Sequence, residues 1–480
     1  MPRRQMNATG AAEAPLRAAL RELRTTLDVP GDFPAAVLAE AEAAAKAPRL
    51  PEEDGTDIPF FTIDPPASVD LDQAMHLARR DGGFRVHYAI ADVAAFVTPG
   101  GALDSEAHRR VQTLYFPDRK VPLHPPALSE GAASLLPGQS APALLWRIDL
   151  DGEGRTVTAD VRRALVRSRA RLDYAGAQRQ IDTGTAEEPL ALLREIGKLR
   201  ETLEIERGGI SLNVPEQEIA QRDDGTYVLA YRAPRPAEGW NAQISLLTGM
   251  AAARLMTASG TGVLRTLPTA PDGAVARLRR SAQALHVEWP HHVSYAELVR
   301  SLDPREPRNA AFLEECTTLL RGAGYSTFTG GVLPVPAVHA AVAAAYTHCT
   351  APLRRLVDRY AGELCLAAVA GREPPEWASA ALEELPAEMA VGSRRGNTVE
   401  RECLDLLEAV LLRGRIDELF DAVVVDVEEN DPSAGTVQLE DPAVVARVDG
   451  GGAPLPLGER LRVRLTEADP GRAKVRFTPA

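Results

Sequence analysis

The stretch FFTIDPPASVDLDQAM, residues 60–75, decides the fold expected of this chain. Its apolar start, 60–63, predicts a strand that ends at Asp64, because the proline that follows forces an extended or turn conformation on its predecessor. Asp70 and Asp72 come next, at the two-residue spacing that places both side chains on one face of an extended segment. The three carboxylates can therefore converge on one point.

Converging carboxylates repel one another unless a cation holds them, and hard oxygen ligands suit Mg²⁺ or Mn²⁺. Taken alone, the pattern is also compatible with an acidic, solvated turn. A calcium-binding EF-hand loop is excluded, because Asp72 is followed by Gln-Ala-Met where that loop needs a further ligand and then a glycine. The sequence also contains no GxxxxGK[ST] phosphate loop and no HExxH zinc motif.

Composition places the chain among ordinary soluble globular proteins, with 45% hydrophobic and 25% charged residues in a length of 480. That length allows two or three domains. No apolar run reaches the roughly 20 residues of a membrane-spanning helix, and the first residues are polar, so we expect a cytoplasmic protein with no membrane partner. Cys316, Cys349, Cys365 and Cys403 form no CxxC pair, which favours buried free thiols.

The net charge of −13 argues against a protein that coats nucleic acid unspecifically, because such binding depends on many basic side chains. A nucleic-acid enzyme with this charge must gather its positive side chains locally. Arginine supplies nearly all of them, and lysine occurs only at positions 46, 120, 198 and 474. A guanidinium group can hold a phosphate through two hydrogen bonds, although an arginine cluster such as 162–171 is equally compatible with a solvated surface.

The N-terminal part of the chain is expected to be helical. Residues 12–27 carry apolar side chains at helical spacing, and an alanine-rich helix is predicted over 33–46. The segment 48–59 is rich in proline and aspartate and reads as a linker. Residues 1–50 are therefore expected to form a short helical unit, compatible with a helical hairpin or a helix-turn-helix.

The rest of the chain mixes strands and helices and then ends in strands. Residues 84–91 alternate as a strand does, 144–150 and 156–166 flank a D-G-E-G turn as a hairpin, and 240–258 predicts a helix. We expect a mixed α/β (α+β) catalytic domain over 55–400. Five short strands separated by turn residues within 415–480 suit an OB-fold β-barrel.

Five segments resemble the signatures of one family, the RNB catalytic domain of ribonuclease II. They are TIDPPASVDLD (62–72), HYAIADV (87–93), VQTLYFPD (111–118), VPLHPPALSEGAASLLP (121–137) and YTHCTAPLRRLVD (346–358). Their order along about 300 residues makes coincidence improbable. The C-terminal barrel fits the RNA-binding domain that follows the catalytic domain in this family.

The resemblance implies an exoribonuclease that threads single-stranded RNA, 3′ end first, into a narrow channel. It also implies hydrolysis assisted by two metal ions, Mg²⁺ or Mn²⁺, with release of nucleoside 5′-monophosphates. Asp64, Asp70 and Asp72 would be the metal ligands. Gln73 stands where the family has a fourth acidic residue and would offer the metal a neutral carbonyl oxygen instead of a carboxylate.

The same resemblance assigns further site residues. Tyr115 matches a tyrosine that stacks on the terminal nucleotide, a role that an aromatic face performs without reading base sequence. Arg354 matches the arginine that contacts the scissile phosphate, where a fixed guanidinium stabilises developing charge. Arg355 is expected either to contact a second phosphate or to pair with Asp358, and Glu400 matches a glutamate near the terminal nucleotide.

The sequence also departs from the family pattern. Besides Gln73, the segment 240–250 carries Gln243 and Gly249 where the family helix has glutamate and asparagine, and the residues before 55 do not read as cold-shock barrels. These departures leave open an alternative, a catalytically weakened RNA-binding protein of the RNB fold. They also allow a duplex with a 3′ overhang as a substrate beside single-stranded 3′ ends. We expect no obligate protein partner.

Overall fold

The structure is a computed structural model that describes residues 14–212, 216–221, 227–232, 234–270, 273–304, 306–320, 322–428, 430–439, 441–471 and 474–480. The first residues of the predicted helix 12–27 lie outside this part of the chain. Among the described residues, no helix is long and apolar enough to cross a membrane. The four cysteines are buried and free, as expected.

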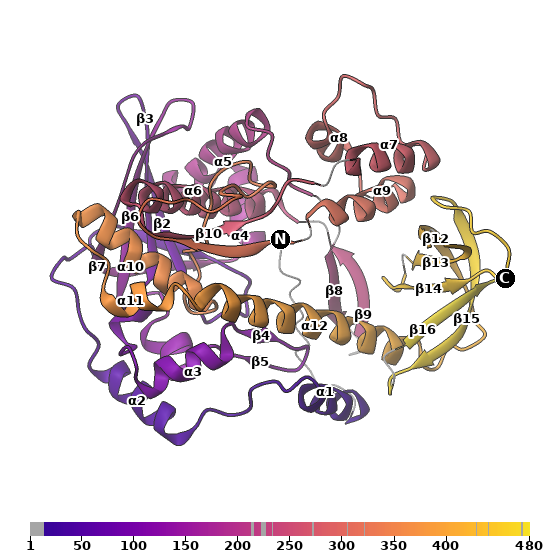
Figure 1. The fold of residues 1–480 in the computed structure, drawn as a ribbon, viewed down its shortest axis with the longest axis horizontal. Coiled ribbons are helices and arrows are strands. Elements are labelled where there is room, and N and C mark those ends of the chain that lie inside the picture. Colours follow the sequence, from indigo (N-terminus) through magenta and orange to yellow (C-terminus); the bar gives the residue numbers. More distant parts are fainter. Residues whose placement is uncertain are drawn as a thin grey trace.

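A closed five-stranded barrel forms the centre of the catalytic domain (Figure 1). In spatial order its strands are β1 (Phe60–Ile63), β2 (Gln73–Arg80), β3 (Gly83–Ala91), β6 (Ser140–Asp151) and β7 (Thr156–Leu172). Neighbouring strands are antiparallel, except that β1 pairs with β7 in parallel. The strands predicted at 60–63 and 84–91 and the hairpin around the D-G-E-G turn are therefore confirmed. Closure of the strands into a barrel was not predicted.

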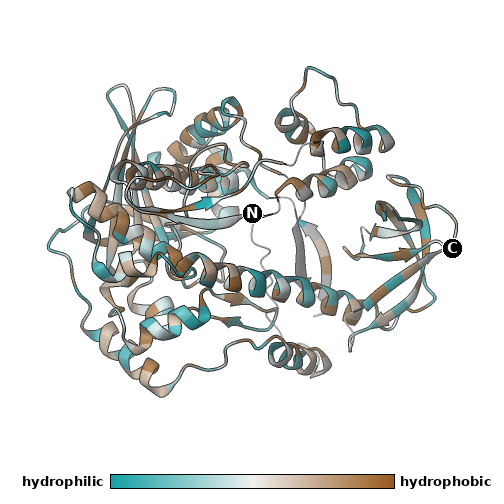
Figure 2. Cartoon of the chain, in the orientation of Figure 1, coloured by the Kyte–Doolittle hydropathy of each residue, from teal (hydrophilic) through white to brown (hydrophobic). Residues whose placement is uncertain are grey.

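Helices cover one side of this barrel and bury its largest core. They are α4 (Tyr174–Thr183), α5 (Glu188–Glu206), α6 (Pro236–Ser259), α10 (Leu356–Ala370) and α11 (Glu376–Ala381). Helix α6 packs on α5 and α10, and both α6 and α10 bury about half or more of their residues. Figure 2 shows hydrophobic and hydrophilic residues side by side on these helices. Trp146 and Tyr88 of the barrel strands lie fully buried in the core beneath them. The predicted helix 240–258 is confirmed within α6.

The two N-terminal helices form where the sequence predicts them, but they pack on different partners. Helix α2 (Ala35–Lys46) lies against α3 (Ala102–Arg110) and the π-helical turn Leu128–Ala132, on the other side of the barrel. Helix α1 (Ala14–Thr26) instead packs on α12 (Leu385–Leu412). The described residues of the N-terminal unit are thus built into the rest of the molecule, and do not form a hairpin of their own.

Three short sheets and three further helices complete the catalytic part. The sheets pair β4 (Leu114–Tyr115) with β5 (Lys120–Val121), β8 (Glu216–Gln221) with β9 (Tyr227–Arg232), and β10 (Gly262–Thr266) with β11 (Gly324–Phe328). The helices are α7 (Ala274–Ala284), α8 (Tyr295–Ser301) and α9 (Pro307–Thr317), and short 3-10 turns occur at Val93–Ala95 and Thr318–Leu320. Helix α9 packs against the first strand of the C-terminal barrel.

The C-terminal strands close into a second five-stranded barrel, which confirms the expected OB-type fold. Its strands, in chain order, are β12 (Leu419–Glu428), β13 (Asp431–Leu439), β14 (Val445–Asp449), β15 (Arg460–Asp469) and β16 (Lys474–Pro479). Figure 1 shows α12 running from the catalytic part to this barrel. Phe420 and Phe477 meet edge to face inside it, buried, so these two aromatic rings stabilise its core and present no face to a ligand.

Candidate active site

Asp72 and Arg354 form the centre of the site. Asp72 directly precedes β2 and is 3% exposed, because the segment 346–355 folds over it. Its Oδ1 accepts a hydrogen bond from the Leu353 backbone N–H at 2.7 Å, and its Oδ2 accepts one from Arg354 Nε at 2.6 Å. The guanidinium of Arg354 is thereby fixed in orientation beside the acidic motif, as a phosphate-binding arginine must be.

Asp64 lies at the end of β1, close enough to the other two aspartates to interact with them. Burial, opposed by the charge of Arg354 and assisted by the charges of Asp72 and Asp70, raises the pKa of Asp64 to about 7. Among the described residues, its carboxylate has no hydrogen-bond partner. A half-buried carboxylate beside like charges is the chemical situation in which a bound cation stabilises the anionic form.

Asp70 is held by a lysine. Lys120, on β5, places its Nζ 3.0 Å from Asp70 Oδ1 and 2.9 Å from Glu130 Oε1. Burial alone would lower the pKa of Lys120, but Asp70 and Glu130 together raise it, so the ammonium stays charged. We did not single out Lys120 from the sequence. The available signal was its rarity, since it is one of only four lysines and lies between two of the family-like segments.

Gln73 is engaged at both ends of its side chain. Its Oε1 accepts a hydrogen bond from the Tyr88 hydroxyl at 3.0 Å, and its Nε2 donates to the backbone oxygen of Thr350 at 2.5 Å. The Tyr88 hydroxyl also meets Ser245 Oγ at 2.8 Å. The carbonyl oxygen that we expected Gln73 to offer to a metal is therefore used within the protein, and the side chain ties β2 to the segment that carries Arg354.

Tyr115 is brought to the site by a short hairpin. Strands β4 and β5 pair Tyr115 directly with Lys120, so the two side chains lie on one face. The Thr113 N–H donates to the backbone oxygen of Arg354 at 3.0 Å, which holds this hairpin against the arginine segment. Tyr115 also contributes to raising the pKa of Arg354, as expected of a near neighbour.

Arg355 turns away from this group and pairs with Asp358. Its Nε and Nη2 donate to the two carboxylate oxygens of Asp358 at 2.8 and 2.6 Å, and the Asp358 side chain is 0% exposed. Asp358 also accepts the Ala351 N–H at 2.7 Å. Of the two roles expected for Arg355, these contacts support the structural one.

Glu400 lies on α12, one turn beyond Gly396. A Cβ at Gly396 would stand 2.1 Å from Gln112 Nε2, which shows how closely α12 passes the chain that leads into β4. Helix α12 and β4 are in contact. This position is on the same side of the molecule as Tyr115, and the role of Glu400 toward the terminal nucleotide stays a prediction.

The two departures in α6 have structural reasons. A Cβ at Gly249 would lie 2.3 Å from the Tyr346 ring and 2.5 Å from the Thr347 carbonyl oxygen, so only glycine allows the segment 346–355 to approach α6 this closely. Gln243 is buried and donates to Glu204 at 2.5 Å. Gly249 therefore lets the arginine segment approach α6, and Gln243 joins α6 to α5.

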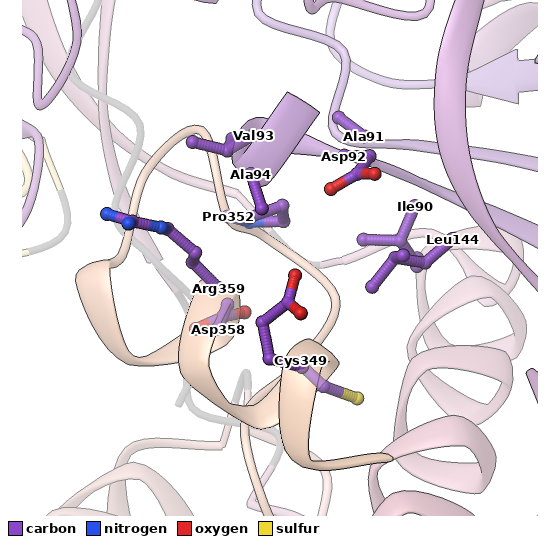
Figure 3. A pocket seen from close by; sticks show the side chains of 11 residues that line it. Ile90, Ala91, Asp92, Val93, Ala94, Leu144, Cys349, Pro352, Asp358 and Arg359 are labelled. Atoms are coloured by element: carbon purple, nitrogen blue, oxygen red, sulfur yellow. The ribbon is translucent and has the colours of Figure 1, made fainter. Parts of the chain in front are cut away.

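A small cavity lies behind the arginine segment, lined by Asp92, Asp358, Arg359, Pro352 and their neighbours (Figure 3). Its volume is about 10 Å³, which is room for a single water molecule. This cavity is too small to hold a nucleotide.

The donor set fits a divalent cation only in part. In the portion of the chain that the structure describes, no three His, Cys, Asp or Glu side chains are gathered closely enough to hold a metal. Asp64 and Asp72 supply the oxygen chemistry that Mg²⁺ prefers, whereas Asp70 and Gln73 are held by Lys120 and by Tyr88 with Thr350. Both Asp72 oxygens also accept hydrogen bonds, from Leu353 and Arg354, so each of these side chains except Asp64 has a partner among the described residues.

Comparison with known proteins gives matches to both parts of the chain. Residues 52–370 match the RNB domain profile, and residues 418–480 match the RNase II-type exonuclease C-terminal S1 domain. Ribonuclease R of Aquifex aeolicus is 26% identical over 94% of this chain. The chain spans 68% of that protein and 63% and 59% of the next two curated relatives.

Solved structures match in fold. Mycoplasma genitalium RNase R, solved with ribose-methylated single-stranded RNA and with double-stranded RNA, gives TM-scores of 0.84 and 0.82 at 20% and 21% identity. Those matches cover 97% of this chain and 78% and 83% of the Mycoplasma chains. Yeast Ssd1, described as a pseudonuclease, gives a TM-score of 0.65 at 17% identity, over 93% of this chain and 54% of its own.

Proposed function

Because this chain belongs to the RNB family, we propose that it is a hydrolytic exoribonuclease that shortens RNA from the 3′ end. The observation that carries the proposal is the meeting of Asp72, Arg354 and Tyr115, which come from three separate segments of the chain. An acid, a fixed guanidinium and an aromatic ring at one place are what phosphodiester hydrolysis at a strand end needs.

Each residue has a role that follows from its contacts. The ring of Tyr115 stacks on the terminal base, a contact that tolerates any base sequence. Arg354 stabilises the negative charge that develops on the scissile phosphate, and Asp72 keeps its guanidinium in place through the 2.6 Å bond. A divalent cation held at the acidic motif of Asp64, Asp70 and Asp72 would supply an activated water and further charge stabilisation.

The proposed substrate is single-stranded RNA and the proposed products are nucleoside 5′-monophosphates. Attack of water on the terminal phosphodiester breaks the bond to the 3′ oxygen of the preceding nucleotide, which leaves the phosphate on the 5′ oxygen of the released one. The test is incubation of 5′-labelled RNA with Mg²⁺, with Mn²⁺ or with EDTA, followed by gel analysis of the ladder and chromatography of the products.

We expect a metal-dependent ladder and mononucleotides from the wild-type protein. Asp72→Asn should lower the single-turnover rate by about a hundredfold or more while RNA affinity changes little, because a charge that acts in the transition state is lost. No shortening of RNA in either metal would refute the proposal. An Asp72→Asn protein that cleaves at the wild-type rate would refute the role of Asp72.

We also propose that a duplex with a 3′ overhang is a substrate. The support is that Mycoplasma RNase R, whose fold this chain shares, has been solved with double-stranded RNA. A blunt duplex, an overhanging duplex and a single strand of the same sequence should be compared at equal concentration. Digestion that stops where the overhang ends would limit the substrate to single strands.

The second candidate is an RNA-binding protein that has lost turnover. It is favoured by Gln73 in place of a fourth acidic residue and by the fold similarity to the pseudonuclease Ssd1. Tight binding of RNA without mononucleotide release in Mg²⁺ or Mn²⁺ would support it. The ion pair between Asp72 and Arg354 is present in this chain, and for this reason we rank the catalytic function above RNA binding without turnover.

A further inference from the structure

The arginine cluster 162–171 divides into two parts in the structure. It lies in β7, and its first two arginines are paired with carboxylates. Arg162 Nη1 lies 2.9 Å from Glu53 Oε1, and Arg163 Nε lies 2.7 Å from Asp92 Oδ2. These two guanidinium groups stabilise the fold, and each is already balanced by a negative charge.

The last three arginines of β7 differ from these because they are exposed to solvent. Arg167, Arg169 and Arg171 occupy alternate positions of the strand, whereas Val166 and Ser168 are buried. Alternate residues of a strand lie on one face, with Cα atoms about 7 Å apart. We call Arg167, Arg169 and Arg171 the arginine row.

Two members of the arginine row are bonded to neutral acceptors. Arg167 donates to Ser140 Oγ through Nε at 3.1 Å and through Nη2 at 3.0 Å. Arg171 Nη2 donates to the backbone oxygen of Pro66. Among the described residues, neither arginine has a carboxylate within ion-pair distance. Their positive charges are therefore available to an anionic ligand.

Two acidic residues lie near the arginine row, and both are exposed. Arg169 Nη2 is 4.0 Å from Glu187 Oε2. The pKa of Asp54 is lowered mainly by its hydrogen bonds to Thr56, and only slightly by Arg167. Solvent screens pairs of this kind, so the row keeps most of its positive field.

The arginine row ends beside the acidic motif. Strand β7 pairs with β1 in parallel, with Arg171 opposite Thr62. Two residues after Thr62, the Asp64 N–H donates to the Leu172 carbonyl oxygen at 3.1 Å. Burial raises the pKa of Asp64 to about 7, and the charge of Arg171 is among those that oppose this rise. The row therefore runs from the half-buried Asp64 along the exposed end of β7.

The chemistry of the proposed product fits this row. A phosphate monoester carries a charge of about −2 near pH 7, and the three aspartates of the acidic motif repel it once the phosphodiester bond is cut. The shortened strand can advance only after the released nucleotide has left. A guanidinium group holds a phosphate through two hydrogen bonds and reads no base, so a row of them accepts any nucleotide.

We propose that Arg167, Arg169 and Arg171 bind the phosphate of the released nucleoside 5′-monophosphate and lead it away from the acidic motif. The proposal rests on the exoribonuclease function proposed above. Arg171 receives the phosphate first because it lies beside Asp64, and Arg169 and Arg167 then draw it along the surface of β7.

The first experiment measures product binding and needs no activity. AMP, adenosine and inorganic phosphate are each titrated into the full-length protein in EDTA, and binding is followed by isothermal titration calorimetry. We expect AMP and phosphate to bind and adenosine to bind far more weakly. Combining Arg167→Gln with Arg169→Gln should weaken the binding of AMP and of phosphate by about tenfold, because charge-assisted hydrogen bonds are lost.

The matched control for this double variant is Arg155→Gln. Arg155 is an exposed arginine in the turn between β6 and β7, and its guanidinium lies near Glu153 and Glu206. We expect Arg155→Gln to bind AMP as the wild type does. An AMP affinity that is unchanged in the double variant would overturn the proposal.

The second experiment compares the first cut with later ones. In the double variant, RNA affinity and the single-turnover rate of the first cut should equal those of the wild type, because the acidic motif is unchanged. The rate of later cuts should fall by about tenfold at low salt, since a row of like charges speeds the transfer of an oppositely charged ligand by at least this factor. Added AMP should also inhibit the double variant less than the wild type.

Two results of the second experiment would overturn the proposal. Later cuts at the wild-type rate in the double variant would show that product release does not use the row. A loss of RNA affinity with unchanged AMP affinity would assign the row to the RNA strand instead of the product.

These outcomes separate the two proposals. A wild-type chain that degrades no RNA in Mg²⁺ or Mn²⁺ removes the proposed function, while the AMP titration still tests the row. A chain that degrades RNA but binds AMP equally well without the two arginines retains the function and removes the proposal on product release. Melting temperatures show whether each variant is folded, and the single variants Arg167→Gln and Arg169→Gln serve if the double variant is not.

Discussion

At the scale of single residues, Gln73 gives a sharp prediction. Gln73→Asp adds a carboxylate to the acidic motif, but it removes the amide that donates to the Thr350 carbonyl oxygen. A buried carbonyl left without its donor costs about 1–3 kcal/mol. We expect a lower melting temperature and a cleavage rate reduced by about tenfold, in keeping with a loss of this size in the transition state.

The control for Gln73→Asp is Tyr88→Phe, which removes the bond at the other end of the amide and adds no charge. Both variants should lower the melting temperature and the cleavage rate. The Mg²⁺ concentration that gives half the maximal rate then shows whether residue 73 binds the metal. If Gln73→Asp lowers this concentration and keeps the wild-type stability, then position 73 is a metal ligand after all.

Arg354 and Arg355 are neighbours with different expected roles. Arg355→Gln leaves the buried Asp358 carboxylate without its ion pair, and such a loss costs about 3–5 kcal/mol of stability. We expect a lower melting temperature, with unchanged RNA affinity in the folded fraction. Arg354→Gln should instead reduce the turnover rate strongly and change the melting temperature little. Weaker RNA binding by Arg355→Gln at a temperature where it is folded would assign that arginine to a phosphate.

At the scale of elements, helix α1 supports the hairpin that carries Tyr115. Arg24 donates to both carboxylate oxygens of Asp118 at 2.7 and 3.0 Å, and its guanidinium lies over the Phe116 ring. Arg24→Met should therefore loosen the hairpin, with a melting temperature lower by several degrees, since about 2–4 °C accompany each kcal/mol in a domain of this size. A higher KM for RNA should accompany it.

Arg21→Met is the matched control for Arg24, because Arg21 is exposed on the same helix. The pair itself is tested by combining Arg24→Met with Asp118→Asn. If the salt bridge is responsible, the double variant should be no less stable than Arg24→Met alone. Equal melting temperatures of Arg21→Met and Arg24→Met would show that α1 does not hold the hairpin.

Local patterns in the sequence predicted the elements well, and contacts between distant segments account for the rest. The alternation in 84–91 and the turn after β6 depend on neighbours in sequence, so their strands could be read directly. The bond between Gln73 and Thr350 joins positions 277 apart. The sequence around Gln73 and the sequence around Thr350 do not indicate this hydrogen bond. Local sequence also does not indicate that the strands close into a barrel, or that Lys120 forms an ion pair with Asp70.

At the scale of the whole molecule, a buried histidine should contribute to the change in folding stability with pH. Burial and the charge of Arg359 lower the pKa of His124 to about 3. The unfolded chain binds a proton to this histidine near pH 6.5 while the folded chain does not, so stability is lost as pH falls below about 6.5. At pH 5 the loss from this one group is about 2 kcal/mol.

Urea midpoints at pH 7.5 and pH 5.0 test this expectation. His124→Asn cannot take up the proton, so its midpoint should fall less between the two pH values than the wild-type midpoint does. The effect of His87, whose pKa is lowered to about 4 by burial and by His76 and nearby arginines, should remain in the variant. An equal fall in both proteins would show that other groups control the acid transition.

RNA binding by an acidic protein should depend strongly on salt. On β15, Arg460, Arg462 and Arg464 alternate with inward-facing residues and are exposed on one face of the C-terminal barrel. Replacing Arg460 and Arg462 by glutamine should reduce the slope of log affinity against log salt by about 1.4, if each holds one phosphate of a single strand. Filter binding at several salt concentrations measures the slope, and Arg372→Gln is an exposed control.

The scarcity of lysine has a practical consequence for handling this enzyme. Lys46, Lys198 and Lys474 are exposed, whereas Lys120 is held between two carboxylates. Reagents that acylate amines should therefore attach the protein to a resin or a dye through the three outer lysines first, and leave the arginines unmodified. The fourth amine should react only at higher reagent concentration, because the ammonium of Lys120 is paired with Asp70 and Glu130.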